Sequence, residues 1–270
     1  MQVRKPTFDF SKISRYYFAD NAWATHVMNA LHVIVPIGEL FFIRAVRGLA
    51  DEAPAEQKQD IRKFIGQESV HDQAHRQFWQ TLRDQNLPVD AFAEFFRSTA
   101  IETMEPIVER LLGKKFLLSA TVGFEHYTAA LADIAFAPGS QLLPSMQKEV
   151  ADLMRWHAAE EIEHKSVAFR QLMSIDDSYL LRAGGMVLAS SLLTFYTIAG
   201  TAWFIAGDRE LTLARLIKDL PQLPQIARGL VSGVIRHNAE YFMPGFDPDT
   251  KNNYPRAEAA LRELGLAIAS

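Results

Sequence analysis

Residues 155–169 read RWHAAEEIEHKSVAF, and residues 64–78 read FIGQESVHDQAHRQF. Each stretch holds one Glu-x-x-His motif, Glu161 with His164 in the first and Glu68 with His71 in the second. Positions i and i+3 lie on the same face of an α-helix, so each motif presents a carboxylate and an imidazole side by side. The two stretches therefore predict two helices that each offer a pair of metal ligands.

A lone glutamate precedes each motif. Glu39 lies within VIVPIGELFFI and Glu125 follows ATVGF, two apolar contexts in which an unpaired charge is costly. One Glu from each of two helices plus Glu-x-x-His from each of two others is the ligand set of di-iron and di-manganese helix bundles. Two transition-metal ions are therefore expected, iron first, with manganese and zinc as alternatives. The ligands and catalytic residues expected for this centre are Glu39, Glu68, His71, Glu125, Glu161 and His164.

Two further histidines belong to the same pattern. His157 precedes Glu161 by one helical turn, so we expect it to be an additional metal ligand. His75 follows His71 at the same spacing, and it is expected either as a ligand or as a neighbour of the ligands. An imidazole bonded to a nearby carboxylate, in the core or at the surface, is the alternative for His75 and for His126.

Other residues compete less well for the site. Glu102 and Glu105 are alternatives to Glu125, but their surroundings, IETMEPIVER, are more polar and indicate an exposed face. His26, His32 and His237 have no partner at ligand spacing, so structural roles are expected for them. The large aromatic side chains are expected in the core, with one or two lining a substrate cavity: Phe41, Phe42, Trp79, Trp156 and Phe169.

Apolar residues recur with helical periodicity along the chain, and alternating strand patterns are missing. The expected fold is all-α, a ferritin-like four-helix bundle with additional C-terminal helices. The expected helices span about 20–50, 54–84, 89–112, 114–136, 141–173, 178–206, 222–243 and 255–266. We expect one domain over 1–270, with the metal-binding bundle at about 20–173 and an apolar helix at about 178–206 packed on it with the C-terminal helices.

Composition excludes several classes of protein. The chain has 49% hydrophobic residues, a formal net charge of -4 and scattered basic residues, so nucleic-acid binding is not expected. It contains no cysteine, which excludes disulfides, thiolate nucleophiles and cysteine-type metal sites. The first twenty residues lack the apolar region of a secretory signal, so a cytoplasmic location is the default expectation.

The segment 183–207 carries no charge and is long enough to cross a bilayer. Its glycines, serines and threonines dilute the hydrophobicity, and its flanking charges give no clear orientation. Three roles remain open: a central buried helix, a helix embedded in or docked on a membrane, and a homodimer interface. Our expectation is that it covers the metal bundle or lines its substrate entrance rather than spanning a bilayer.

The stretches NALHVIVPIGELFFIRAVR (29–47), FIGQESVHDQAHRQF, FEHYTA (124–129) and RWHAAEEIEHKSVAF resemble those of bacterial proteins known as predicted metal-dependent hydrolases. The resemblance covers most of residues 25–172, and YFMPGFDP (241–248) is also similar. It implies a ferritin-like metal site. The motif His157-x-x-x-Glu161-x-x-His164 is in addition similar to that of the di-iron arylamine N-oxygenases, where a further histidine joins the second iron. This second resemblance is confined to the motif.

The symmetric ligand set favours an oxidoreductase that activates O₂ at two irons, acts on an apolar or amine substrate and draws on an external electron donor. Hydrolytic two-metal sites lie more often in loops of mixed folds. A two-metal hydrolase, as the family label suggests, is nevertheless the alternative, and a non-catalytic metal-binding protein is the third hypothesis.

Overall fold

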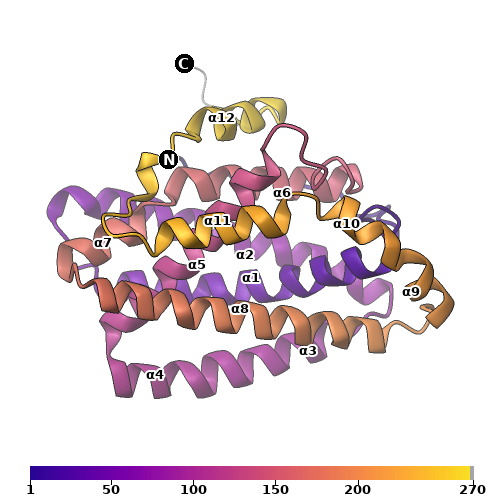
Figure 1. Cartoon of the computed structure of the whole chain (residues 1–270), viewed down its shortest axis with the longest axis horizontal. Coiled ribbons are helices and arrows are strands. Elements are labelled where there is room, and N and C mark those ends of the chain that lie inside the picture. Colours follow the sequence, from indigo (N-terminus) through magenta and orange to yellow (C-terminus); the bar gives the residue numbers. More distant parts are fainter. Residues whose placement is uncertain (268–270) are drawn as a thin grey trace.

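Four long helices bring the two Glu-x-x-His motifs and the two lone glutamates into one bundle. They are α1 (Ala22–Gly48), α2 (Lys58–Asp84), α5 (Lys114–Ala135) and α6 (Lys148–His164). In this computed structural model, which describes residues 1–267, α1 packs on α2 and α5, while α6 packs on α2 and α5. The all-α class is confirmed, and these four helices form the predicted bundle core (Figure 1).

A proline inside α1 links it to α2. Pro36 has no N–H group, so it cannot donate the usual helical hydrogen bond to the carbonyl of His32. The indole Nε1 of Trp79 on α2 donates to that carbonyl instead, at 2.7 Å. This contact fixes the two helices against each other about two turns before Glu39, the first lone glutamate.

The remaining elements surround the bundle. After α2 the chain forms α3 (Val89–Phe96), the π-helical segment η2 (Arg97–Met104) and α4 (Glu105–Leu112) in direct succession. Helix α7 (Val167–Ile175) follows α6, and α8 (Tyr179–Gly207) packs along α5 and α1. The C-terminal helices are α9 (Leu213–Asp219), α10 (Leu223–Ile226), α11 (Leu230–Tyr241) and α12 (Tyr254–Glu263). Three short 3₁₀ turns complete the elements, η1 (Ala55–Gln57), η3 (Leu220–Gln222) and η4 (Pro248–Thr250).

Small residues let α8 approach the bundle closely. A Cβ atom on Gly185 would lie 2.3 Å from the carbonyl carbon of Ser119 on α5, and one on Gly200 would lie 2.7 Å from the Cβ of Ala30 on α1. Only glycine fits at these two contacts, because side chains of ordinary size would push the helices apart. The inner face of α8 is therefore held firmly against α1 and α5.

Helices α1 and α8 are both long and apolar enough to cross a membrane. In its most apolar 18-residue window α1 is 72% buried, as the core helix of a bundle is, whereas α8 is only 22% buried. The hypothesis of a central buried helix over 183–207 is therefore wrong, because α8 covers the bundle with one side and exposes the other.

The structure also differs from the predicted helices in three regions. The helix expected over 141–173 begins only at Lys148 and breaks at 165–166, between α6 and α7. The helix expected over 222–243 is divided into α10 and α11, because Gly229 adopts a left-handed conformation, with φ of 79°, that ends regular helix. Helix α9 was not predicted, since seven residues next to Pro221 give little periodicity.

Candidate metal centre

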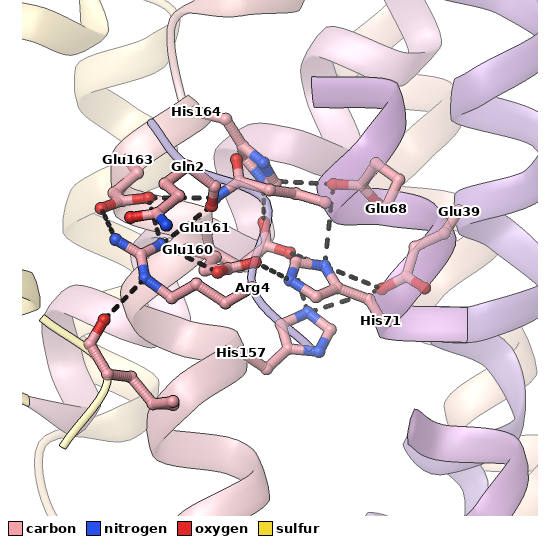
Figure 2. Close-up of polar contacts among 12 residues, drawn as sticks. Gln2, Arg4, Glu39, Glu68, His71, His157, Glu160, Glu161, Glu163 and His164 are labelled. Carbon is pink, nitrogen blue, oxygen red and sulfur yellow. Dashed lines mark hydrogen bonds and ion pairs between the residues drawn. The ribbon is translucent and has the colours of Figure 1, made fainter. Parts of the chain in front are cut away.

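The bundle interior holds all six expected ligands. Glu39 comes from α1, Glu68 and His71 from α2, Glu125 from α5, and Glu161 and His164 from α6. Each side chain is at most 3% exposed. Buried charges of this kind occur in proteins when they are paired or bind metal ions. The helical spacing of the sequence thus brings the two halves of the pattern face to face, and Figure 2 shows five of the six together.

One half of the cluster consists of Glu39, His71, His157 and Glu161, whose ligand atoms all lie within 4.8 Å of one another. The Nε2 atom of His157 lies 2.8 Å from Oε1 of Glu161 and 3.5 Å from Oε1 of Glu39. The Nδ1 atom of His71 lies 3.7 Å from each of the same two oxygens. The structure therefore places His157 among the carboxylates, as expected of an additional ligand.

The other half consists of Glu68, Glu161 and His164, again with ligand atoms within 4.8 Å. The Nε2 atom of His164 lies 3.2 Å from both Glu68 and Glu161, and 3.4 Å from Glu125. Glu161 belongs to both halves, because Oε1 faces His157 and Oε2 faces His164. A carboxylate whose two oxygens face different halves of the cluster is suited to bind two cations.

The donor atoms fit a pair of divalent ions. Within residues 1–267, both carboxylate oxygens of Glu39, Glu68 and Glu125 are buried and accept no hydrogen bond. Buried acceptors are rarely left unpaired without an ion, a water or a functional reason. Carboxylate and imidazole donors suit iron, manganese and zinc, and four carboxylates carry the charge that balances two divalent cations. The residues present thus fit a di-metal site without selecting the metal.

The pKa shifts of the cluster residues also fit a site for cations. Burial, together with the neighbouring carboxylates, raises the pKa of Glu39 and of Glu68 well above the ordinary value. Burial also raises the pKa of Glu125 to about 8, although His164 acts against this. Burial alone would lower the pKa of His164, but Glu161 and Glu125 raise it to about 9. In the metal-free protein, several of these side chains therefore carry a proton that a bound cation would displace.

A second layer of polar residues, which the sequence did not reveal, orients the ligands. Oε2 of Glu160 lies 3.1 Å from Nε2 of His71, on the side of the ring away from the cluster. Arg4, from the N-terminal segment, donates to Glu160 at 2.9 Å and to both oxygens of Glu163 at 2.8 Å (Figure 2). Gln67 donates to Glu163 at 3.0 Å. Glu160 is the first residue of the EE pair in this stretch, and no local pattern predicts its contact with His71.

A chain of three imidazoles leads away from the cluster. Nδ1 of His157 lies 2.8 Å from Nε2 of His75, and Nδ1 of His75 lies 2.8 Å from Nδ1 of His32. His75 therefore contacts the candidate ligand His157 and lies one ring further from the carboxylates. His32 contacts His75, a partner that its sequence position did not predict. Because each of these two contacts joins two ring nitrogens, one of which must donate and the other accept, the tautomers of the three rings depend on one another.

An apolar cavity of about 240 Å³ adjoins the cluster. His75, His157 and Glu161 lie in its wall, together with apolar side chains of α1, α5 and α8 such as Phe41, Phe124 and Leu192. The π-helical segment η2 contributes Ala100 and Ile101 to the same wall. An apolar molecule bound in this cavity would contact the candidate metal-binding residues directly.

The other candidates lie elsewhere. Glu105 forms an ion pair with Arg44, and Glu102 forms one with Arg97 at the surface, so neither reaches the cluster. His26 contacts Asp208 and His237 contacts Asp133, as structural histidines do. His126 contacts the carbonyl oxygen of His237 through Nε2. The aromatic residues expected in the core are buried: Phe41, Phe42, Trp79, Trp156 and Phe169.

A family model described as predicted metal-dependent hydrolase matches residues 2–252 of the chain. No curated protein and no solved structure matches the chain. The matched range contains every carboxylate and imidazole of the cluster, the second layer around Glu160, and the residues that line the cavity.

Proposed function

The chain belongs to the family of predicted metal-dependent hydrolases, and from this premise we propose that it hydrolyses ester-class bonds in an apolar substrate with two divalent cations. The observation that carries the proposal is that His157 and Glu161 lie both in the metal cluster and in the wall of the apolar cavity. A carbonyl group attached to an apolar body in the cavity would therefore reach the centre.

The buried side chains divide the work of holding the ions. Glu39, His71 and His157 would hold one cation, Glu68, Glu125 and His164 the other, and Glu161 both. When bound, two such cations would polarise a carbonyl oxygen and lower the pKa of a bound water molecule. Glu160 keeps His71 in the required orientation through its contact with Nε2.

The cavity supports an apolar substrate class. Its wall is built mainly from aliphatic and aromatic side chains, which favour alkyl or aryl groups over charged ones. The same side chains keep bulk water away from the cluster, so the charges of the centre act with little screening. A fatty acyl ester is the simplest substrate that combines an apolar body with a carbonyl group that can be hydrolysed.

The test uses the full chain, stripped of metal with a chelator and reloaded with Zn(II), Mn(II) or anaerobic Fe(II). Hydrolysis of p-nitrophenyl acetate, hexanoate and dodecanoate is then followed by absorbance. We expect activity that depends on added metal and rises with acyl chain length. Glu161→Gln should abolish it, because this carboxylate is shared by both halves of the cluster.

Glu109→Gln is the matched control, since Glu109 lies exposed on α4, away from the cluster. It should behave like the wild type in both metal content and hydrolysis. Esterase activity that is unchanged in Glu161→Gln, or that does not require metal, would contradict the proposal.

Oxygen-dependent oxidation of an apolar or amine substrate is the second candidate. The symmetric supply of Glu and Glu-x-x-His by four helices favours it, because this is the ligand set of oxygen-activating helix bundles. The family match favours hydrolysis instead, so the preference for oxidation drawn from the motif is not supported. Stoichiometric O₂ consumption by the Fe(II) protein, with no hydrolysis under any metal, would make oxidation the better account.

A further inference from the structure

Exposed large apolar side chains gather on three C-terminal helices. Val187, Phe195 and Ile198 project from α8, Leu213 and Ile217 from α9, and Ile235 from α11. We call these six residues the apolar face. The helices that carry them lie on the near side of the molecule in Figure 1. Helices α8 and α11 are also linked, because Tyr127 Oη donates to Ser190 and accepts from Asn238. Large exposed apolar clusters on a protein surface mark interaction sites.

The outer side of α8 suits an apolar environment along its length. Residues 183–207 carry no charge, and the exposed Ser191 donates its hydroxyl hydrogen to the carbonyl of Val187 at 2.8 Å. Phe195 and Ile198 are 57% and 65% exposed, so little of the protein covers them. A hydroxyl that is bonded within its own helix costs little to bury in an apolar medium.

Cationic side chains flank the apolar face. Arg209 precedes α9, Lys218 lies in the last turn of α9, and Arg228 precedes α11. Within residues 1–267, these three form no ion pair, whereas the nearby Glu210 and Asp219 are paired with arginines. The face is therefore apolar with unpaired positive charges at its edge.

We propose that the apolar face docks on the surface of a bilayer that contains anionic phospholipids. Apolar side chains would enter the boundary between headgroups and acyl chains, while Arg209, Lys218 and Arg228 would contact phosphate groups. The charge pattern favours this partner, since three exposed cations without a carboxylate partner in the described part of the chain complement anionic headgroups.

Docking parallel to the surface follows from the packing of α8. Gly185 and Gly200 hold its inner side against α5 and α1, so α8 cannot span a bilayer without leaving the bundle. Leu188, Leu192 and Tyr196 on that inner side line the apolar cavity. The cavity thus lies directly beneath the proposed docking surface, where apolar molecules from the bilayer are most concentrated.

Vesicle flotation with the purified full chain tests the proposal. One set of vesicles contains phosphatidylcholine alone, and the other contains phosphatidylcholine with phosphatidylglycerol. We expect the wild type to float with the second set, less so at high salt, because the cationic contribution is screened. The double variant Phe195→Glu/Ile198→Glu should lose binding at least about 10-fold, as each charge is costly in the headgroup boundary.

Gln77→Glu is the control for added charge, since Gln77 is exposed on α2, outside the apolar face. It should bind vesicles like the wild type. Glu161→Gln should also bind normally, so a failure of the proposed hydrolysis does not affect this test. Unchanged circular dichroism of the Phe195→Glu/Ile198→Glu variant verifies that it is folded.

Three outcomes would overturn the proposal. One is equal flotation of the wild type and the double variant. Another is a wild type that is dimeric without lipid and does not float, combined with a monomeric double variant, which would identify the face as a subunit interface. The third is retention of the wild type in native membranes after a carbonate wash, which would indicate a membrane-spanning helix.

Discussion

Oε2 of Glu160 lies 3.1 Å from Nε2 of His71, on the side of the imidazole that faces away from the metal centre. The opposite nitrogen, Nδ1, faces the carboxylates of Glu39, Glu68 and Glu161. A carboxylate that accepts the ring N–H fixes both the tautomer and the orientation of a ligating histidine. This contact makes Glu160 a positioning residue of the centre.

We therefore expect Glu160→Gln to weaken metal binding about 10- to 100-fold, as losses of such partners do. The measurement is a competition titration of Zn(II) against a chromophoric chelator. Glu163→Gln is the matched control, because Glu163 shares the contact with Arg4 but not the one with His71. Equal affinities in the two variants would show that the contact with His71 does not matter.

Metal stoichiometry should distinguish the shared carboxylate from the others. Glu161→Ala should lose most of both ions, because this residue belongs to both halves of the cluster. Glu125→Ala should lose mainly one ion, since Glu125 lies 3.4 Å from His164, in one half of the cluster. Elemental analysis of the purified variants provides the ratio. A Glu161→Ala protein with full metal content would refute the bridging role.

Metal binding should release protons and strengthen as the pH rises. The pKa of Glu125 is about 8, and that of His164 is about 9, so both groups carry a proton in the metal-free protein at pH 7. Both must lose it to bind a cation, so affinity should increase between about pH 6 and 9 and then level off. Calorimetric titration of Zn(II) in buffers of different ionisation enthalpy should report about two or more protons released per chain.

The cavity should set the preferred length of the acyl chain. Ala100 lies in its wall, so Ala100→Phe would fill part of the space. We expect kcat/KM for p-nitrophenyl dodecanoate to fall about 10-fold, with little change for the acetate, because each methylene in an apolar pocket contributes about 1 kcal/mol or more. Ala91→Phe, at an exposed position of α3, should leave the ratio of kcat/KM for the dodecanoate to that for the acetate unchanged.

The close contact between α5 and α8 should make Gly185 sensitive to any side chain. A Cβ atom there would lie 2.3 Å from the carbonyl carbon of Ser119, so Gly185→Ala should destabilise the protein by about 1–3 kcal/mol. Gly38→Ala is the control, since its Cβ would meet only the ring of Phe42, at 3.8 Å, and alanine favours a helix by about 1 kcal/mol. Thermal unfolding should therefore show opposite shifts in Tm.

Helical periodicity determined most of the candidate site from the sequence. In Glu68 with His71, and in Glu161 with His164, a spacing of three residues places both side chains on one face, whatever the helix packs against. The apolar surroundings of Glu39 and Glu125 indicated their burial, and both are buried in the bundle. These inferences hold because they depend on neighbours within two turns of one helix. The break after His164 was missed, because Lys165 and Ser166 carry no strong signal for ending a helix.

Tertiary structure decided the role of Glu160. The spacing to His164 indicated Glu161 as a ligand, and Glu160 lies about 100° from it around the helix. Only the packing of α6 against α2 places Glu160 beside Nε2 of His71. Arg4 reaches Glu160 from 156 residues away, and such a contact leaves no local pattern. The same holds for α8, whose apolar sequence fits either a core helix or a surface helix. Its glycines meet α1 and α5 on one side only, so the other side is left exposed.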